Sequence, residues 1–356
     1  MISASEAERI WLYFSGAFDG KEIPALTAQY RAWSKTRPLE GLRILDATPL
    51  FLNTCVKHAA LIAGGADLTA AYSDLVPYDP KVVELLEKQG VRTVRNAYSR
   101  TDNAAYDVIL DCGGVHCGMS SIYGAVELTR SGVPRYERRT GRNVFLADSG
   151  VIKRIETSLG TGESCLRALT HLGYGPFPGK NVLILGGGKV GGGIAAYFRR
   201  AGALVSVADD PASVPGAIPF RSRAAMTEAV RAADFIVTAT GRANAHAELA
   251  DELTACRAVL VNMGVEDEFG PDVPESRVLN RKAPLNFILD EPTRTRYIDP
   301  TMALDNEGVL ILKNAAPGTG LIVPGAVLEK RILDDVRRGG VIGAELELIL
   351  KGNGKL

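Results

Sequence analysis

A glycine-rich turn followed by an acidic residue is the pattern in this chain that most clearly suggests chemistry. The largely apolar residues 181–185 lead into Gly186, Gly188 and Gly191, and a helix-compatible sequence follows. In such a turn the first glycine permits a tight bend, the second lets the backbone approach a pyrophosphate, and the third lets the helix pack on the strand. A second apolar run ends at Asp209, about twenty residues further on, where a carboxylate accepts hydrogen bonds from the adenosine ribose. The sequence therefore predicts a dinucleotide site, and the repulsion between Asp209 and a 2′-phosphate favours NAD over NADP. The alternative is a glycine turn of an α/β protein that binds no ligand.

Four more residues follow apolar runs in the same part of the chain. Thr238, Thr240 and Gly241 follow one run, and Asn262 ends the next. Because ligands of parallel sheets lie at the carboxyl ends of the strands, we predict that these four residues bind the cofactor. Turn residues satisfied by their own neighbours are the alternative interpretation.

Two cysteines and a histidine surround a second glycine turn. The apolar run 106–111 ends at Asp111 and is followed by Cys112, two glycines, His116 and Cys117. Imidazole titrates near neutrality, so His116 is the first candidate for acid–base work, with Asp111 and Cys112 as candidate substrate-binding residues. A core or solvated histidine is the alternative. We predict no metal site, because no second ligand pair at Cys-x-x-Cys or similar spacing occurs elsewhere.

A third group of polar candidates comes later in the chain. Lys153, Glu156 and Thr157 open a helical stretch that we place from about residue 154 to 172. We predict that Lys153 and Glu156 are catalytic and that Thr157 binds substrate, in a cleft between two domains that His116 also faces. Since Lys153 and Glu156 lie three residues apart, a surface ion pair is the alternative.

Short apolar runs alternate with helical stretches along the chain, which is typical of parallel sheets. The expected strands are residues 42–47, 67–72, 91–94, 106–111 and 143–147, then 181–185, 203–208, 235–240, 258–262 and 309–312. The expected helices include 56–62, 80–87, 154–172 and 324–335. The fold class that we predict is α/β, with two doubly wound Rossmann-like domains whose parallel sheets carry helices on both faces.

The length of the chain also indicates two domains. Its 356 residues exceed the ~250–300 at which a single core usually stops growing. We expect a substrate-type domain over residues 1–152, completed by 318–356, and an NAD-binding domain over 153–317. The helical residues 324–335 would then cross back to the first domain.

Composition excludes several classes of function. Lys and Arg together number 41, as do Asp and Glu, so charge gives no case for nucleic acid or an anionic membrane as partner. No apolar run reaches the ~18 residues of a membrane span, and the N-terminus carries Glu6 and Glu8 where a secretory signal carries bases. The five scattered cysteines suit reduced thiols. We expect a cytoplasmic protein that binds a small-molecule substrate.

Taken together, these segments resemble S-adenosylhomocysteine hydrolase over roughly residues 38–315. The matching motifs are Pro38-Leu-Glu-Gly-Leu-Arg-Ile44, Val108-Ile-Leu-Asp-Cys-Gly-Gly114, Asp148-Ser149, Leu159-Gly160 with Glu163-Ser164, the glycine loop, Val237-Thr-Ala-Thr-Gly241 and Val261-Asn-Met-Gly264. The resemblance implies that a substrate domain, interrupted in sequence, closes over an NAD domain. It also implies a reaction in which NAD first oxidises the ribose 3′-hydroxyl, a base removes the C4′ proton, homocysteine leaves, water adds, and the cofactor returns to its starting state.

The family's catalytic residues do not carry over. Its histidine after the first strand falls on Pro49, its lysine after Asp-Ser on Ile152, and the histidine of Asn-x-Gly-His on Val265. These three side chains cannot transfer protons, so we do not expect adenosylhomocysteine hydrolysis. Other departures are Phe51 at a threonine, Cys112 at the second aspartate of Asp-Asp-Gly-Gly, and Glu156-Thr157 at an Asp-Asn pair.

The resemblance also bears on assembly. The family has a C-terminal extension with a lysine and a tyrosine that reaches the cofactor of a neighbouring protomer, and no counterpart is found up to Leu356. We therefore do not expect the family's tetramer. If the protein forms a homo-oligomer, the state that we consider is a homodimer.

Four functions remain open. The favoured one is an NAD-dependent, oxidoreductase-type enzyme acting on a hydroxylated small molecule, either as a plain dehydrogenase or with the cofactor recycled in each turnover. A catalytically silent NAD-binding regulatory or partner protein is the main alternative. Residual hydrolase activity and a Rossmann methyltransferase are less favoured, the latter because the glycine loop and Asp209 fit NAD better.

Overall fold

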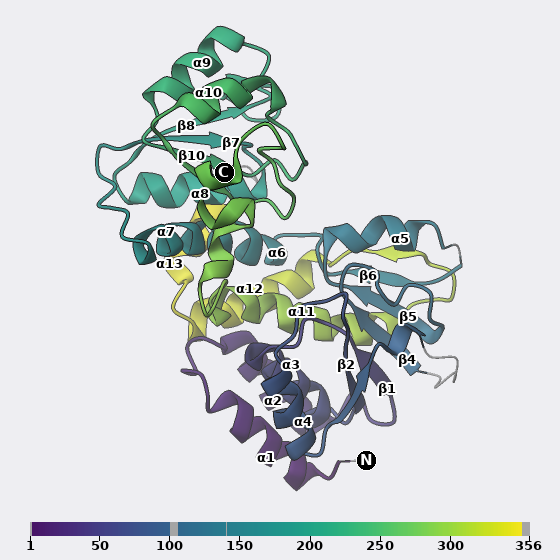
Figure 1. The fold of residues 1–356 in the computed structure, drawn as a ribbon. Helices are drawn as coiled ribbons and strands as arrows, with labels where there is room; N and C mark the ends of the chain where they lie inside the picture. The colour runs from purple at the N-terminus through teal and green to yellow at the C-terminus, as the bar shows by residue number, and fades with distance from the viewer. Residues whose placement is uncertain (1, 100–105, 140, 351–356) are drawn as a thin grey trace. The chain divides into compact units, whose positions relative to one another are not determined.

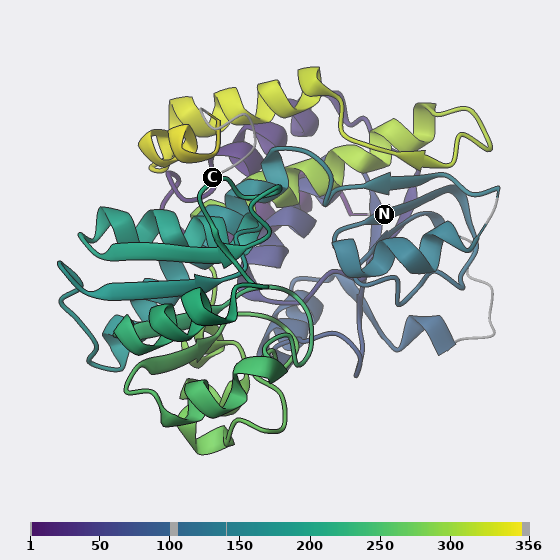
Figure 2. The same ribbon diagram turned by 90° about the horizontal axis from the view of Figure 1, so that it is seen from above.

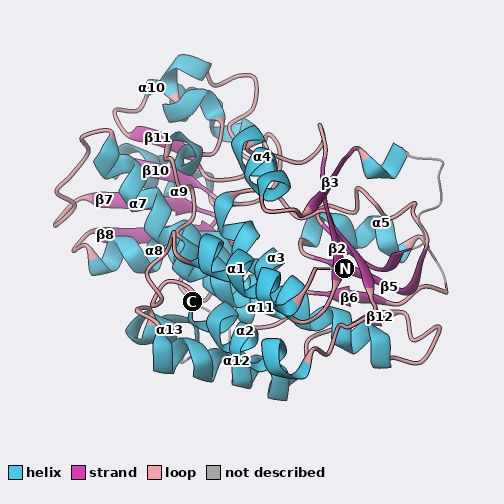
Figure 3. Ribbon diagram, turned by 90° about the horizontal axis from the view of Figure 1, so that it is seen from below, coloured by secondary structure: helices cyan, strands magenta, loops and turns pink. Residues whose placement is uncertain are grey.

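The computed structural model describes residues 2–99, 106–139 and 141–350. It divides into two compact units, which we describe separately. Unit 1 contains Met1–Lys153 and Ile298–Gly343, and unit 2 contains Arg154–Tyr297 and Ala344–Leu356. In both, the strands (magenta in Figure 3) form one sheet flanked by helices.

Unit 2 is built on a five-stranded parallel sheet. Its strands are β7 (Asn181–Leu185), β8 (Leu204–Asp209), β9 (Ile218–Pro219), β10 (Phe235–Thr238) and β11 (Val259–Asn262), and its longer helices are α7 (Thr161–His171), α8 (Lys189–Arg200), α9 (Arg223–Ala232), α10 (Ala250–Ala255) and α13 (Gly343–Leu350). The spatial order is β11-β10-β7-β8-β9, so the direction in which strands are added reverses between β7 and β10. That reversal is the topological switch point at which open α/β sheets bind ligands.

The apolar runs of unit 2 bury side chains on both faces of its sheet. Val182 and Ile184 pack with residues of α7 and α8, whereas Leu183 and Leu185 pack with residues of α9 and α10. Figure 1 shows these two pairs of helices on opposite sides of the sheet. Since consecutive strand residues point to opposite faces, near-continuous hydrophobic strands are what a sheet covered on both sides requires.

Unit 1 repeats this topology with a larger sheet. Its strands are β1 (Arg43–Asp46), β2 (Asp67–Tyr72), β3 (Arg92–Arg95), β4 (Tyr106–Asp111), β5 (Ser121–Glu127), β6 (Val144–Leu146) and β12 (Leu321–Ile322), and its helices are α1 (Ala4–Ser15), α2 (Pro24–Thr36), α3 (Leu52–Ala63), α4 (Pro80–Lys88), α5 (Val133–Glu137), α6 (Ile152–Arg154), α11 (Thr295–Asn314) and α12 (Ala326–Gly339). The order β12-β6-β5-β4-β1-β2-β3 is parallel throughout and reverses between β1 and β4. Both units are therefore doubly wound Rossmann-like sheets, which confirms the predicted fold class.

Helices cover both faces of the unit 1 sheet. Leu45 and Ile109 pack with Val133 and Tyr136 of α5 on one face. On the other, Gly308 of α11 lies so close to Phe145 and Val126 that an added β-carbon would stand 2.6 Å and 2.8 Å from their side chains. In Figure 2 the yellow α12 runs along the purple N-terminal helices, where Gly339 and Gly340 lie near Pro24 of α2.

A buried charge cluster holds the carboxyl end of β1. The ammonium group of Lys57, on α3, lies 2.5 Å from Asp46 of β1 and 2.7 Å from Asp305 of α11, and all three side chains are fully buried. Thr48 adds a hydrogen bond to Asp46 at 2.7 Å. Removing one member would leave an uncompensated buried charge, so these ion pairs tie β1 to both helices.

The structure corrects part of the predicted secondary structure. Residues 309–312, expected as a strand of the second domain, lie within α11 and belong to unit 1, since a short apolar run cannot distinguish a strand from a buried helix. The second boundary between the units accordingly falls at 297/298 instead of the expected 317/318. Helix α12, expected over 324–335, does belong to unit 1, whereas the residues from Ala344 on, also expected in the first domain, belong to unit 2. The helix expected over 154–172 is interrupted by a π-helical segment, η3 (Ile155–Gly160).

Within the described ranges, no helix combines the length and the apolar character that crossing a membrane requires.

Candidate functional site

The three glycines of the turn after β7 differ in the space beside each of them. At Gly186 φ is +102°, and an added β-carbon would lie 2.6 Å from the carbonyl oxygen of Ala239. At Gly191 an added β-carbon would overlap the carbonyl oxygen of Gly186. At Gly188, the N-cap of α8, nothing lies within 4 Å of the corresponding position. The protein itself therefore occupies the space beside the first and third glycines and leaves the second open, as expected where a pyrophosphate approaches the backbone.

Asp209 ends β8 beside this turn. One of its carboxylate oxygens accepts the backbone N–H of Gly187 at 2.6 Å, and the other accepts that of Asp210 at 2.7 Å. The two bonds fix the orientation of a half-buried carboxylate next to the glycine loop. A carboxylate has about four lone-pair sites, so acceptor capacity remains for ribose hydroxyls.

Thr238 and Asn262, predicted to bind the cofactor, are fully buried. The hydroxyl of Thr238 donates to Oδ1 of Asn262 at 2.9 Å, and the same oxygen accepts the N–H of Gly264 at 3.0 Å. The amide nitrogen of Asn262 donates to the carbonyl oxygens of Glu266 at 2.8 Å and Lys282 at 2.6 Å. Both side chains therefore hold the loop after β11 in place, and that they bind the cofactor stays a prediction.

Thr240 and Gly241, the other two predicted residues, lie in the loop after β10 and are held by Glu268. This glutamate is fully buried, and sequence reasoning missed it. It stands in the acidic run Glu266-Asp267-Glu268, which has the composition of an exposed loop. The sequence alone does not show that Glu268 is the one acid of this run whose side chain is fully buried.

In unit 1, Asp111 and His116 form a buried pair after β4, next to the switch point of that sheet. Nδ1 of His116 lies 3.0 Å from Oδ1 of Asp111, and the backbone N–H of His116 donates to Oδ2 at 2.9 Å. The imidazole is 2% exposed, and its edge packs against the ring of Tyr98. Its Nε2 has no hydrogen-bond partner among the residues that the structure describes. Asp111 also accepts the hydroxyl of Tyr136 at 2.6 Å, so its oxygens are engaged by the protein itself.

A second buried carboxylate, Glu127, orders the glycine turn between these residues. It ends β5 and accepts the N–H groups of Gly113 at 2.9 Å and Gly114 at 2.8 Å, together with the hydroxyl of Thr129 at 2.6 Å. Burial raises the pKa of Glu127 to about 7, although the bonds from Thr129 act in the opposite direction. Sequence reasoning missed this residue because β5 was not among the expected strands.

Cys112 and Lys153 lie at the same edge of unit 1. Burial, and then the charge of Glu127, raises the pKa of the Cys112 thiol to about 12, so it is a neutral thiol and a poor nucleophile near neutrality. Lys153 is 3% exposed, and its charge acts on both Cys112 and Asp305. Lys153 is therefore a buried side chain and not an exposed one.

Glu156 and Thr157 lie on the π-helical segment η3 of unit 2, and both are half-buried. This segment packs tightly on α8, because an added β-carbon at Gly193 would overlap the carbonyl oxygen of Ser158. π-Helical turns are found frequently at functional sites. That Glu156 and His116 share one cleft stays a prediction, because they belong to different units.

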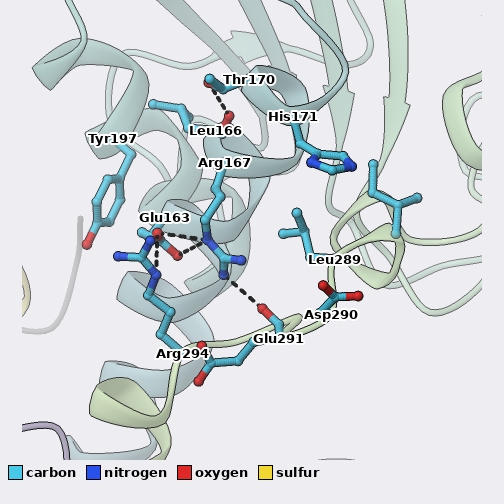
Figure 4. Close-up of a pocket in the computed structure, with 11 residues that line it drawn as sticks. Glu163, Leu166, Arg167, Thr170, His171, Tyr197, Leu289, Asp290, Glu291 and Arg294 are labelled. Carbon is cyan, nitrogen blue, oxygen red and sulfur yellow. Dashed lines mark hydrogen bonds and ion pairs between the residues drawn. The ribbon is translucent and has the colours of Figure 1, made fainter. Parts of the chain in front are cut away.

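The described part of unit 2 also has an open groove of about 780 Å³ beside α7 (Figure 4). Three of its charged side chains pair: Glu163 accepts from Arg167 at 3.0 Å and lies 3.3 Å from Arg294. Arg167 also donates to the carbonyl oxygen of Glu291 at 2.9 Å. The groove is lined by none of the predicted site residues.

Comparison with known proteins agrees with this geometry. Residues 176–270, which contain the glycine loop, Asp209 and the loops after β10 and β11, match a family model described as putative NAD(P)-binding. The chain is 29% identical to an adenosylhomocysteinase of Pyrococcus abyssi over 289 residues, which are 72% of this chain and 68% of that protein. It is 27% identical to an adenosylhomocysteinase of Thermoplasma acidophilum over 329 residues, which are 84% of this chain and 78% of that protein.

Other relatives carry different names. An S-inosyl-L-homocysteine hydrolase of Methanopyrus kandleri is 29% identical over 247 residues, or 62% of this chain and 58% of that protein. Among solved structures, a dipicolinate synthase chain of Bacillus halodurans has a TM-score of 0.49 at 16% identity and covers 78% of this chain and 99% of its own. The resemblance to adenosylhomocysteinases that the sequence indicated is therefore confirmed at 27–29% identity, and unit 2 carries a nicotinamide-nucleotide-binding domain.

Proposed function

We propose that the chain is an NAD-dependent enzyme of the oxidoreductase type that acts on a hydroxylated small molecule. The observation that carries this proposal is the Asp111–His116 pair, at a strand end of unit 1 where open α/β sheets bind ligands. A buried carboxylate bonded to one ring nitrogen selects the tautomer and leaves the other nitrogen as an acceptor.

The proton chemistry follows from that geometry. With the proton of His116 on Nδ1 and donated to Asp111, Nε2 accepts the proton of a substrate hydroxyl. The residues around the glycine loop and Asp209 would hold the cofactor, whose nicotinamide would supply the complementary chemistry, acceptance of a hydride from the carbon that bears this hydroxyl. Lys153 places a buried positive charge near Cys112, and Cys112 offers a neutral thiol as a hydrogen-bond donor. We assign the remaining substrate contacts to Glu156 and Thr157.

His116→Asn tests the assignment of the base. Asparagine can still donate a hydrogen bond to Asp111 from about the position of Nδ1, but it has no counterpart of Nε2. With a panel of nucleosides and hydroxy acids, we expect the wild type to reduce NAD⁺ with at least one compound, followed at 340 nm. The variant should lower kcat for that compound by a factor of ~10²–10⁴. His171→Gln, which changes an exposed histidine of unit 2, is the control and should leave the rate unchanged.

Asp209 is the basis of the proposed preference for NAD over NADP. We expect wild-type protein to bind NADH at least about tenfold more tightly than NADPH, because a carboxylate accepts from the 2′-hydroxyl and repels a 2′-phosphate. Asp209→Asn should reduce this ratio, whereas Asp210→Asn removes the same charge from an exposed neighbour and should preserve most of it. Fluorescence titration measures both. Equal or tighter binding of NADPH by the wild type would contradict the proposal.

A catalytically silent NAD-binding regulator is the second candidate. The observation that favours it is that polar groups at the edge of unit 1 are engaged within the protein, with His116 2% exposed and Asp111 fully buried. Tight NADH binding together with no reduction of NAD⁺ by any compound of the panel would make this the better assignment.

A further inference from the structure

The fully buried Glu268 joins two loops at the switch point of unit 2. It accepts the backbone N–H of Thr240 at 2.8 Å, the hydroxyl of Thr240 at 2.9 Å and the backbone N–H of Gly241 at 2.6 Å. All three donors belong to the loop after β10. Glu268 itself follows β11, so one carboxylate sets the spacing between the two loops.

The close packing around this carboxylate leaves little freedom in either loop. A β-carbon added at Gly264, directly after β11, would overlap the carboxylate of Glu268. At Gly241 φ is +70°, a conformation that side chains rarely adopt. The backbone at Gly241 in the loop after β10 and at Gly264 in the loop after β11 therefore has a conformation that leaves room for the carboxylate of Glu268. Asn262 also holds the loop after β11, because its Oδ1 accepts the N–H of Gly264.

The location of these loops indicates which part of a dinucleotide they serve. A sheet of this kind binds a dinucleotide across its switch point, with one mononucleotide on each half. The half formed by β7, β8 and β9 carries the glycine loop and Asp209, the features that hold pyrophosphate and adenosine ribose. The half formed by β10 and β11, with the loops that Glu268 joins, is left for the nicotinamide mononucleotide moiety.

We propose that Glu268 is the positioning residue for the nicotinamide half of the cofactor, because it presents the loops after β10 and β11 in the geometry that this half requires. The inference rests on the proposed binding of a nicotinamide cofactor to unit 2. A carboxylate is needed at this position because all three partners are donors. A carboxamide would turn an N–H₂ group toward at least one of them and leave that donor buried without an acceptor.

The test compares two ligands on Glu268→Gln. NADH reports on both halves of the site, whereas ADP carries only the adenosine half and the two phosphates. We expect the variant to raise the Kd for NADH about tenfold or more, since bonds to a charged acceptor contribute this much. The Kd for ADP should stay within about twofold of the wild-type value. Hydrogen exchange at the amide of Thr240 or of Gly241 should also become faster, because the carboxamide leaves at least one of these two N–H groups without an acceptor.

Glu252→Gln is the matched control. It makes the same chemical change in unit 2, at a carboxylate that accepts from Arg223 at 2.6 Å and Thr227 at 3.3 Å on the neighbouring helix. We expect it to bind NADH and ADP as the wild type does. If Glu268→Gln does not fold, the pair Thr240→Val and Thr240→Ser replaces it. Valine removes one donor to Glu268 and should weaken the binding of NADH about threefold or more with the binding of ADP unchanged, while serine retains the donor and should bind NADH more tightly than the valine variant does.

The outcomes separate this inference from the proposed function. Wild-type affinity for NADH in Glu268→Gln, or equal weakening of NADH and ADP, would overturn the positioning role while leaving a nicotinamide site in place. Failure of the wild type itself to bind NADH would overturn the proposed function and this inference with it.

Discussion

Gly188→Val should abolish binding of NADH, raising its Kd by a factor of about 100 or more. The backbone at Gly188 has φ −68°, and nothing lies within 4 Å of an added β-carbon, so a valine costs the free protein little. The same open space is where the pyrophosphate must approach the amides at the start of α8. A loss of this size corresponds to about 3 kcal/mol of binding free energy, which a side chain in direct overlap with the ligand readily exceeds. Isothermal calorimetry measures the affinity, and circular dichroism checks the fold.

Two further variants test whether Gly188→Val weakens NADH binding by overlapping the ligand and not by disturbing the fold. Ala232→Val adds a similar side chain at an exposed position at the end of α9 and should bind NADH normally. Gly191→Val should fail to fold, because its β-carbon would overlap the carbonyl oxygen of Gly186. Normal NADH binding by Gly188→Val would mean that the glycine loop is a structural turn only.

The backbone of the glycine loop could be predicted from the sequence because its constraints are local. The roles of Gly186, Gly188 and Gly191 depend on backbone conformation and close approach within a few residues, so spacing alone distinguishes them. The alternation of apolar runs with helical stretches similarly predicts parallel sheets. Residues 309–312 show the limit of this pattern. Four consecutive apolar residues fit a strand as well as a buried helix, and these four are helical because they lie within the 20-residue α11.

The residues that organise the site could not be predicted in the same way. Glu127 and Glu268 act on loops 13 to 28 residues away in sequence, and each looks like an ordinary surface acid until the strands pair. Asn262 is predicted to bind the cofactor, and what the sequence could not show is that its amide nitrogen lies within hydrogen-bond distance of three carbonyl oxygens of nearby loops. Position in the chain indicates that a polar residue stands at a strand end. The side chain's direction depends on packing partners far away in sequence.

Purified protein should show no turnover of adenosylhomocysteine, with a rate at least about 10⁴-fold below that of an adenosylhomocysteinase assayed in parallel. Loss of a single proton-transferring group commonly removes a factor of ~10²–10⁴, and in this chain several are replaced. Ile152, fully buried in α6, and Val265, 88% exposed, both carry hydrocarbon side chains, which have no proton to transfer. Release of homocysteine, detected with a thiol reagent, measures the rate.

The most informative control uses the cofactor that the protein is proposed to bind. With NAD bound and adenosylhomocysteine in excess, reduction of the cofactor followed at 340 nm reports the first oxidation separately from release of the thiol. If absorbance rises and no thiol appears, the substrate's hydroxyl is oxidised, and what Pro49, Ile152 and Val265 fail to supply is the later proton transfer. If neither signal appears, the chain does not use this substrate. Thiol release at the rate of the positive control would contradict the prediction and show that other residues, with Lys153 and His116 the first to test, have taken over the chemistry.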